Sequence, residues 1–152
     1  MIKFCSKSDE YFEFSNFYRS PFSVVGKVWK TVEHFYQAAK FIPTDPGWAE
    51  EIRQAETPGE AKKLGRSEEH EMRSDWDEAK ETIMRVALEF KFQDPELRRL
   101  LLSTEGQTLV EHAPWGDAYW GDNGDGTGLN RLGELLMELR ERLLPESDAD
   151  KE

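Results

Sequence analysis

The sequence predicts an α+β fold, in which a single, mostly helical domain carries a small β-sheet. Three observations support this fold class. Short β-prone segments lie near both ends of the chain, at residues 2–5 and 108–112. Another pair of such segments surrounds Gly26, as in a hairpin. Segments that begin with helix-capping residues occupy most of the rest. Strands at the two ends with helices between them are typical of an α+β domain.

The N-terminal third supplies the first predicted strands. Residues 2–5 are β-prone, and residues 22–25 begin a second β-prone segment. That segment continues as Val24-Val25-Gly26-Lys27-Val28-Trp29, in which glycine marks a turn between two short apolar stretches. We therefore predict a hairpin that turns at Gly26-Lys27.

Helices are expected to dominate after residue 31. Thr31 can cap a helix that runs to about residue 41, before Pro43. Asp45-Pro46 and Thr57-Pro58 each combine a capping residue with proline at the first helical position. These two starts predict helices to about residues 55 and 64. Further helices are expected from residue 74 or 75 to 91, from 95 to 102 and, after the strand at 108–112, from 131 to 143.

Length and composition are those of one intracellular domain. We predict a domain at residues 1–145 and an acidic, disordered tail at 146–152. The net charge of −11 argues against a duplex nucleic-acid partner, because phosphate neutralisation supplies most of that affinity. The lone cysteine, Cys5, cannot form an internal disulfide and favours the reducing cytoplasm. No segment approaches the roughly 18 apolar residues of a membrane span, and no obligate protein partner is evident.

The segment after Thr31 carries a polar stripe beside its apolar one. Glu33, Gln37 and Lys40 follow helical spacing, so an acid, an amide and an amine share one face. Two interpretations are open at this point. The stripe is either a solvated face, which is the commoner case, or the lining of a pocket.

A glycine-rich loop, WGDNGDGTGLNRLG, occupies residues 120–133. It lacks the third glycine of a dinucleotide fingerprint and the Gly-Lys-Ser/Thr ending of a P-loop. A calcium loop beginning at Asp122 requires glutamate at its twelfth position, where Gly133 stands. The glycines therefore indicate a tight connection of several turns into the following helix, which leaves Asp117, Trp120 and Asn130 unexplained.

Metal and covalent chemistry find little support. The three histidines are scattered and form no His-Glu-x-x-His pair, and no Gly-x-Ser-x-Gly elbow is present. We therefore predict neither a metal nor an organic cofactor. Lys62 and Arg66 lie four residues apart and can form an anion site, although plain surface cations would look the same. Trp120 and Trp76 are the best candidates to stack on a flat ring.

Several long strings resemble one known family. They are FSNFYRSPF (14–22), TVEHFYQAAKF (31–41), EAKKLGR (60–66), DWDEAKETIMRVALEFKF (75–92), ELRRLLLST (96–104), LVEH (109–112) and AYWGDNGDGTGLNRLGELLMELRERL (118–143). In content and order they resemble the YbiA-like family, also called NADAR for its association with NAD and ADP-ribose chemistry. The resemblance extends over roughly residues 4 to 144.

The resemblance implies an α+β fold and an N-glycosidase activity. YbiA-like members act on early intermediates of riboflavin biosynthesis, which are phosphorylated ribosylaminopyrimidines, and release ribose 5-phosphate and the base. The implied partner is thus a small phosphorylated, nucleoside-like substrate. Breaking a ribosyl C–N bond passes through an oxocarbenium-like state, which a nearby carboxylate stabilises.

The resemblance also implies roles for individual residues. Two carboxylates that match family motifs are predicted to be catalytic: Glu33, beside His34, and Asp117, just before Tyr119-Trp120-Gly121, with Glu111 in reserve. Which carboxylate acts as the base stays open. Cations are expected on the 5-phosphate, aromatic rings on the base or ribose, and amides on hydroxyls or the base edge. The predicted substrate-binding residues are Asn16, Phe17, Lys40, Lys62, Arg66, Trp76, Trp120, Gly121 and Asn130.

Two other functions are compatible with the same residues. One is a glycosidase or reader of ADP-ribose or NAD-derived substrates, which relatives in this family are linked to. Asp122 and Asp125 mildly disfavour it, because they would repel a pyrophosphate. The other is a non-catalytic interaction domain, in which the motifs serve folding alone.

Overall fold

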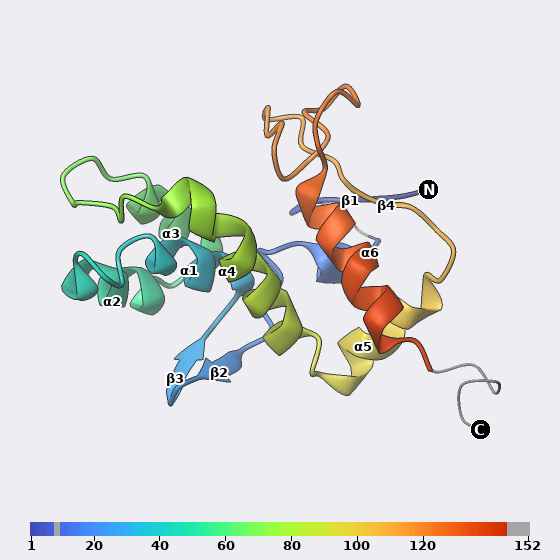
Figure 1. Ribbon diagram of the computed structural model, residues 1–152, viewed down its shortest axis with the longest axis horizontal. Helices are drawn as coiled ribbons and strands as arrows, with labels where there is room; N and C mark the ends of the chain where they lie inside the picture. The colour runs from blue at the N-terminus through green and yellow to red at the C-terminus, as the bar shows by residue number, and fades with distance from the viewer. Residues whose placement is uncertain (8–9, 146–152) are drawn as a thin grey trace. The chain divides into compact units, whose positions relative to one another are not determined.

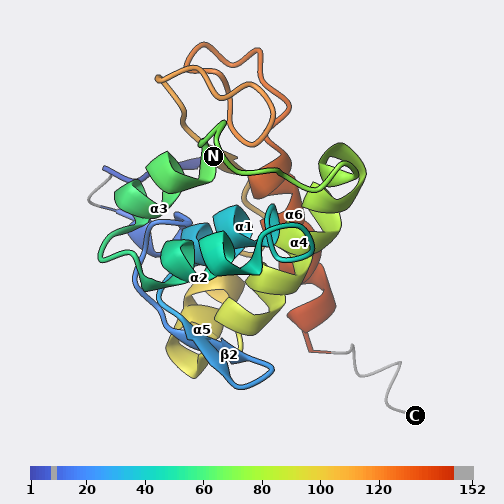
Figure 2. The same ribbon diagram turned by 90° about the vertical axis from the view of Figure 1, so that its left-hand side faces the viewer.

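The computed structural model describes residues 1–7 and 10–145. Helices predominate, with four short strands, and the predicted α+β fold class is confirmed. The strands form two separate two-stranded sheets instead of one. The described residues fall into two compact units, one of residues 16–93 and one of residues 1–7, 10–15 and 94–145. Figures 1 and 2 show the elements of both. The predicted acidic tail lies outside the described residues.

The unit of residues 16–93 is a hairpin with four helices. Three of its helices begin where a capping side chain was predicted: Thr31, Asp45 and Thr57 each accept a hydrogen bond from a backbone N–H three residues ahead. Proline follows the capping residue in two of them, where its missing N–H costs nothing. The elements are β2 (Phe22–Val24), β3 (Lys27–Trp29), α1 (Val32–Ala39), α2 (Pro46–Gln54), α3 (Pro58–Gly65) and α4 (Trp76–Lys91).

Helix α1 is the centre of this unit, and it packs against α2, α3 and α4 (Figure 2). The expected apolar stripe is present: Val32, Tyr36 and Ala39 are buried. The polar stripe is buried as well, since Glu33 and Gln37 are 7% and 4% exposed. The solvated-face interpretation of these two residues is therefore wrong. Packing against three helices leaves α1 little surface in contact with water, and Phe35 is its one residue that is not buried.

The hairpin turns one residue earlier than predicted. Val24 pairs with Lys27, so Val25 and Gly26 form the turn instead of Gly26 and Lys27. Both turn residues adopt left-handed backbone angles, with φ of 49° and 79°. The register pairs Phe22 with Trp29, and both of these aromatic side chains are buried. Aromatic burial therefore sets the register, and Val25 takes a strained backbone conformation as a result.

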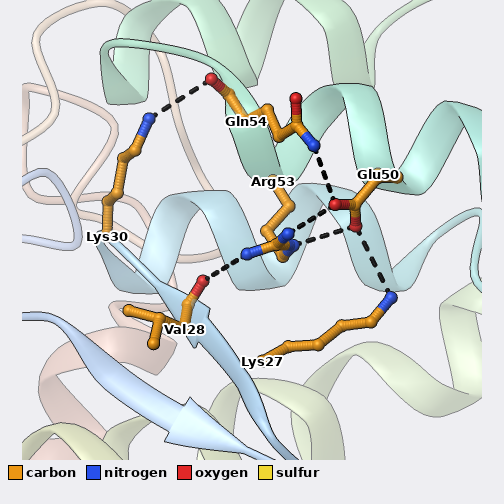
Figure 3. A network of polar contacts seen from close by, with 6 residues as sticks. All are labelled: Lys27, Val28, Lys30, Glu50, Arg53 and Gln54. Carbon is orange, nitrogen blue, oxygen red and sulfur yellow. Dashed lines mark hydrogen bonds and ion pairs between the residues drawn. The ribbon is translucent and has the colours of Figure 1, made fainter.

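A polar network joins this hairpin to α2 (Figure 3). The Arg53 guanidinium donates to both carboxylate oxygens of Glu50 and to the Val28 carbonyl, the last at 3.0 Å. Lys30 Nζ donates to the carbonyls of Gln54 and Ala55 at 3.2 and 2.7 Å, where the last carbonyls of α2 lack helical partners. The pKa of Glu50 is lowered to about 2, chiefly by the hydrogen bond from Arg53. These bonds fix the hairpin at the end of α2.

The other unit combines the two ends of the chain. Strand β1 (Ile2–Phe4) runs parallel to β4 (Leu109–Glu111), and Ile2 pairs with Leu109. Helix α6 (Arg131–Leu143) packs against β4 and against α5 (Pro95–Ser103). A 3-10 turn, η1 (Phe12–Phe14), was not predicted. Arg140 is buried, and its Nη1 donates to two oxygens of Thr104 and to the Gln107 carbonyl. Within residues 1–7 and 10–145, no helix is long and apolar enough to cross a membrane.

Candidate functional site

A buried carboxyl group lies in the first turn of α1. Gln37 Nε2 donates a hydrogen bond of 2.7 Å to Glu33 Oε1, as the four-residue spacing allows. The backbone N–H of Glu33 donates to the Asn16 carbonyl at 3.1 Å. Burial raises the pKa of Glu33 above its usual value, against the lowering effects of Gln37 and of three nearby cations. The protonated form is thus favoured more than in an exposed glutamate.

The three cations are Lys40, Lys62 and Arg66, all of which the sequence predicted to bind substrate. Each contributes a favourable electrostatic interaction with Glu33. Lys40 follows α1, Lys62 lies within α3, and Arg66 follows α3. Lys40 Nζ also donates to the Gly65 carbonyl at 3.3 Å. Burial lowers the pKa of Lys40 to about 8, although Glu33 opposes the change. The fold therefore brings together one carboxyl group and three cationic side chains, all from α1, α3 and the residues that directly follow these helices.

Aromatic rings accompany these cations. Lys40 Nζ lies 5.9 Å from the ring centroid of Tyr36 and 5.8 Å from that of Trp76. The two rings are 5.0 Å apart and tilted by 55°. Lys62 Nζ lies 5.9 Å from the Phe17 ring. Cations within about 6 Å of a ring face are attracted to its quadrupole, so each aromatic contact helps to hold a lysine in place.

Gly65 allows α3 to approach α1 closely. A β-carbon at this position would lie 2.0 Å from Gln37 Oε1 and 2.7 Å from Gln37 Cδ. Only glycine leaves room for the amide that binds Glu33. The helix predicted to about residue 64 gave no sign of this close approach, and neither Gln37 nor Tyr36 was among the predicted site residues. The usable signal was the spacing of Gln37, four residues after Glu33.

Two buried amide oxygens in this unit have spare acceptor capacity. Asn16 Oδ1 and Gln37 Oε1 have no hydrogen-bond partner within residues 1–7 and 10–145. Asn16 Nδ2 faces Met84 Sδ at 3.6 Å, which is a weak acceptor. The Gln37 amide neighbours Glu33 through its Nε2, whereas Asn16 reaches Glu33 through its backbone carbonyl. Gln37 Oε1 is packed against Gly65, so of the two oxygens only Asn16 Oδ1 stays a candidate acceptor for a substrate hydroxyl.

The remaining predicted residues belong to the loop of the other unit. Asp117 Oδ1 accepts the backbone N–H groups of Tyr119 and Trp120 at 3.1 and 2.9 Å. The Asn130 side chain accepts from Glu111 N and donates to the Leu109 carbonyl, both at 2.9 Å. Both side chains thus make bonds that shape the loop and tie it to β4. A substrate role for either stays a prediction.

Trp120 and Gly121 are also part of the packing of this loop. Trp120 is 8% exposed and meets Tyr119 edge-on at 4.8 Å. A β-carbon on Gly121 would lie 2.6 Å from the Ala113 β-carbon. Neither observation tests binding, and their substrate roles, like that of the reserve carboxylate Glu111, stay predictions.

Asp122 organises the loop through its hydrogen bonds, a role that the sequence did not predict. Burial alone would raise the pKa of Asp122, but hydrogen bonds from His112, Ala113 N and Gly124 N lower it to about 2. Gly124 and Gly126 have φ of 83° and 87°, the left-handed turns expected of these glycines. The loop folds around an internal carboxylate, and that is not the construction of a phosphate cradle.

Other parts of the described chain offer weaker candidates for a functional site. A hollow of about 400 Å³ is lined by Arg19, Lys30, Arg53 and neighbours, and an apolar one of about 290 Å³ lies beside the hairpin tip. Neither lining includes a predicted site residue. Over residues 1–7 and 10–145, no group of three or more His, Cys, Asp or Glu side chains is arranged to hold a metal ion.

Comparison with known proteins places this chain in a family. A model of the NADAR domain matches residues 3–144. The chain belongs to the NADAR family. It is 51% identical to N-glycosidase YbiA of Escherichia coli over 94% of this chain and 88% of that protein. The NMR structure of the E. coli protein YbiA matches 93% of this chain and 83% of its own, with a TM-score of 0.84 and 52% identity.

Relatives extend beyond that protein. N-glycosidase Npun_R5314 of Nostoc punctiforme is 42% identical over 86% of this chain and 84% of its own. The chloroplastic riboflavin biosynthesis protein PYRR of Zea mays is 40% identical over 95% of this chain, which corresponds to 25% of the maize protein. This NADAR domain therefore resembles both free-standing proteins and one part of a longer one.

Proposed function

We propose that this NADAR domain is an N-glycosidase that hydrolyses the ribosyl C–N bond of phosphorylated ribosylaminopyrimidine intermediates of riboflavin biosynthesis. The observation that carries the proposal is the buried Glu33 carboxyl among three cations from α1 and α3. The E. coli relative is an N-glycosidase and the maize relative a riboflavin biosynthesis protein, which supports the reaction and the substrate class. A cytoplasmic location, which the single cysteine predicts, belongs to the same proposal.

In this reaction water supplies both new groups. Its hydroxyl bonds to the anomeric carbon, the C–N bond breaks, and the electron pair and a proton go to the base nitrogen. Glu33 has the environment for such proton transfer, since burial raises its pKa toward the working pH. When ionised, the same carboxylate stabilises positive charge at the anomeric carbon. Gln37 holds it in one orientation through the 2.7 Å bond.

The cations suit a phosphate monoester. Lys40, Lys62 and Arg66 carry up to three positive charges, and an ionised Glu33 carries one negative charge, which leaves an excess of about two positive charges in that state. A phosphomonoester carries about −1.5 to −2 at pH 7, which balances that excess. Arginine can bind phosphate oxygens in a bidentate manner, while lysine acts as a point charge. We therefore assign the 5-phosphate to this cluster, in a chain whose overall charge is −11.

The uncharged parts of the substrate require rings and amides. Trp76, Tyr36 and Phe17 offer aromatic faces beside the two lysines. Asn16 Oδ1 can accept from a ribose hydroxyl. Asp117, Trp120, Gly121 and Asn130 stay further candidates, and Asp117→Asn tests the second predicted carboxylate directly.

The proposal is tested by product release. Purified protein is incubated with the ribosylaminopyrimidine phosphate, and ribose 5-phosphate is measured against Glu33→Gln. Release by the wild type alone is expected. Parallel incubations with NAD and with an ADP-ribosylated base, followed by mass spectrometry, test the ADP-ribose alternative. Turnover of those compounds alone would replace the proposed substrate, and turnover of none would favour a non-catalytic interaction domain.

A further inference from the structure

The connection of residues 66–75 joins two parts of the proposed site. It leaves α3 at Arg66 and enters α4 at Trp76 (Figure 1, green). Arg66 is assigned to the phosphate, and the Trp76 ring lies beside the Lys40 ammonium. Ten residues without a helix or strand separate α3 from α4. Their position relative to α1 depends on side-chain and backbone contacts made outside the site.

His70 makes the most specific of these contacts. Its imidazole stacks on the Trp48 ring with centroids 3.8 Å apart and planes 5° apart. His70 Nδ1 lies 2.7 Å from Asp45 Oδ2, and this hydrogen bond is the largest cause of the lowered pKa of Asp45. Two different interactions thus place one ring, so its position is defined in both distance and orientation.

Asp45 and Trp48 are themselves fixed to the helices. Asp45 Oδ1 accepts Trp48 N at 3.1 Å as the N-cap of α2. Trp48 Nε1 donates to the Leu64 carbonyl at 3.2 Å, in the last turn of α3. The Asp45–Trp48–His70 cluster therefore connects the start of α2, the end of α3 and the middle of the connection.

Two more bonds attach the connection to the end of α1. Thr44 Oγ1 donates to the Glu71 carbonyl, and Arg73 N donates to the Lys40 carbonyl at 2.8 Å. The side chain of the same Lys40 reaches Gly65 and the Trp76 ring. A shift at His70 would therefore reach the proposed site from both ends of the connection.

We propose that the Asp45–Trp48–His70 cluster positions Arg66 and Trp76 for binding the phosphorylated substrate, although no residue of the cluster touches it. This inference rests on the proposed function for its substrate. His70, Asp45 and Trp48 are positioning residues, and they determine how tightly substrate binds more than how fast the bond breaks. The hydrogen bond and the stacked ring contribute separately.

Three variants of His70 separate these contributions. His70→Ala removes both interactions, His70→Asn keeps an N–H near the position of Nδ1, and His70→Phe keeps the stacked ring. Met72→Ala is the control in the same connection, because Met72 is exposed and none of the contacts described above involves its side chain. For His70→Ala we expect KM to rise about tenfold with kcat changed less than about twofold, from a lost bond and a lost ring contact. The other two variants should fall between alanine and wild type.

A measurement without substrate distinguishes this inference from the proposed function. NMR of the ligand-free protein follows the indole N–H of Trp76 and the guanidinium N–H of Arg66, which should shift in His70→Ala and stay unchanged in Met72→Ala. If wild type shows no turnover but these signals shift, the proposed function fails and the positioning role stands. The positioning role would be overturned if the Trp76 and Arg66 signals were unchanged in His70→Ala. It would also be overturned if His70→Ala showed a lower kcat at constant KM, or a lower Tm with normal kinetics.

Discussion

Replacement of Glu33 by glutamine is the most informative single change in this protein. The substitution preserves the shape of the side chain and keeps an oxygen to accept the 2.7 Å bond from Gln37. It removes the ability to carry a negative charge or to exchange a proton. Positioned acid–base groups contribute about 10²–10⁴ in rate, which corresponds to roughly 3–5 kcal/mol. We therefore expect kcat/KM for release of ribose 5-phosphate to fall by about two to four orders of magnitude.

The thermal stability of Glu33→Gln should be maintained or increased, although its activity falls. Because burial raises the pKa of Glu33, the folded state binds this proton more tightly than the unfolded chain does. The stability from that difference is present below the unfolded pKa and is lost as pH rises through the folded pKa. Glutamine undergoes no such loss. At pH 7 the Tm of Glu33→Gln should therefore equal or exceed that of wild type, and the difference should shrink toward pH 4.

The result that refutes this reasoning is equally definite. If Glu33 serves folding alone as a carboxylate, the variant exchanges a hydrogen bond to a charged group for one to a neutral amide, at a cost of about 1–1.5 kcal/mol. For a chain of this length that is a fall in Tm of roughly 2–6 °C, with turnover unchanged. Thermal melts by circular dichroism and the product assay decide between the two outcomes. Glu105→Gln, at an exposed position, is the matched control for loss of one carboxylate.

Two further predictions concern the surroundings of Glu33. The pKa of Lys40 is lowered to about 8, so the KM of the wild type should increase above about pH 8, where the Lys40 ammonium loses its charge. Lys40→Met should have a higher KM than wild type at pH 7, and its KM should no longer increase above about pH 8 in a pH series. Gly65→Ala forces a β-carbon onto Gln37 and should cost about 1–3 kcal/mol by overpacking, despite the helix preference of alanine, and should also lower kcat/KM. Gly59→Ala in the same helix, whose β-carbon would meet nothing closer than 4.0 Å, should leave the Tm unchanged or slightly higher. Equal melting of the two glycine variants would contradict the packing argument.

Local signals predicted the secondary structure well. Thr31, Asp45 and Thr57 cap helices where the sequence indicated, because a capping side chain bonds to a backbone N–H only three residues away. The hairpin was found but its turn was misplaced by one residue. Turn chemistry alone favoured Gly26-Lys27, whereas the burial of Phe22 and Trp29 requires Val25-Gly26. Packing across the pair therefore outweighed the preference of the turn residues.

The candidate site, like the fold, was predictable from local sequence only in part. Whole motifs resembled the NADAR family, and the match over residues 3–144 confirms that resemblance. Spacing placed Glu33, Gln37 and Lys40 on one side of a helix, but spacing is the same for a solvated face and for a buried one. No local rule identified Asp122 as the centre of its loop, since its partners His112 and Ala113 lie about ten residues earlier.

The sequence by itself determined where most of the helices begin, which family the chain belongs to, and which residue types are available for chemistry. These properties depend on neighbours along the chain and on strings of residues. Only the tertiary structure decided that α2, α3 and α4 enclose α1, so that Glu33 is buried, Lys40 loses part of its affinity for a proton, and Gly65 makes room for Gln37. Burial and charge proximity arise between segments that are distant in sequence, and desolvation acts only once those segments have packed.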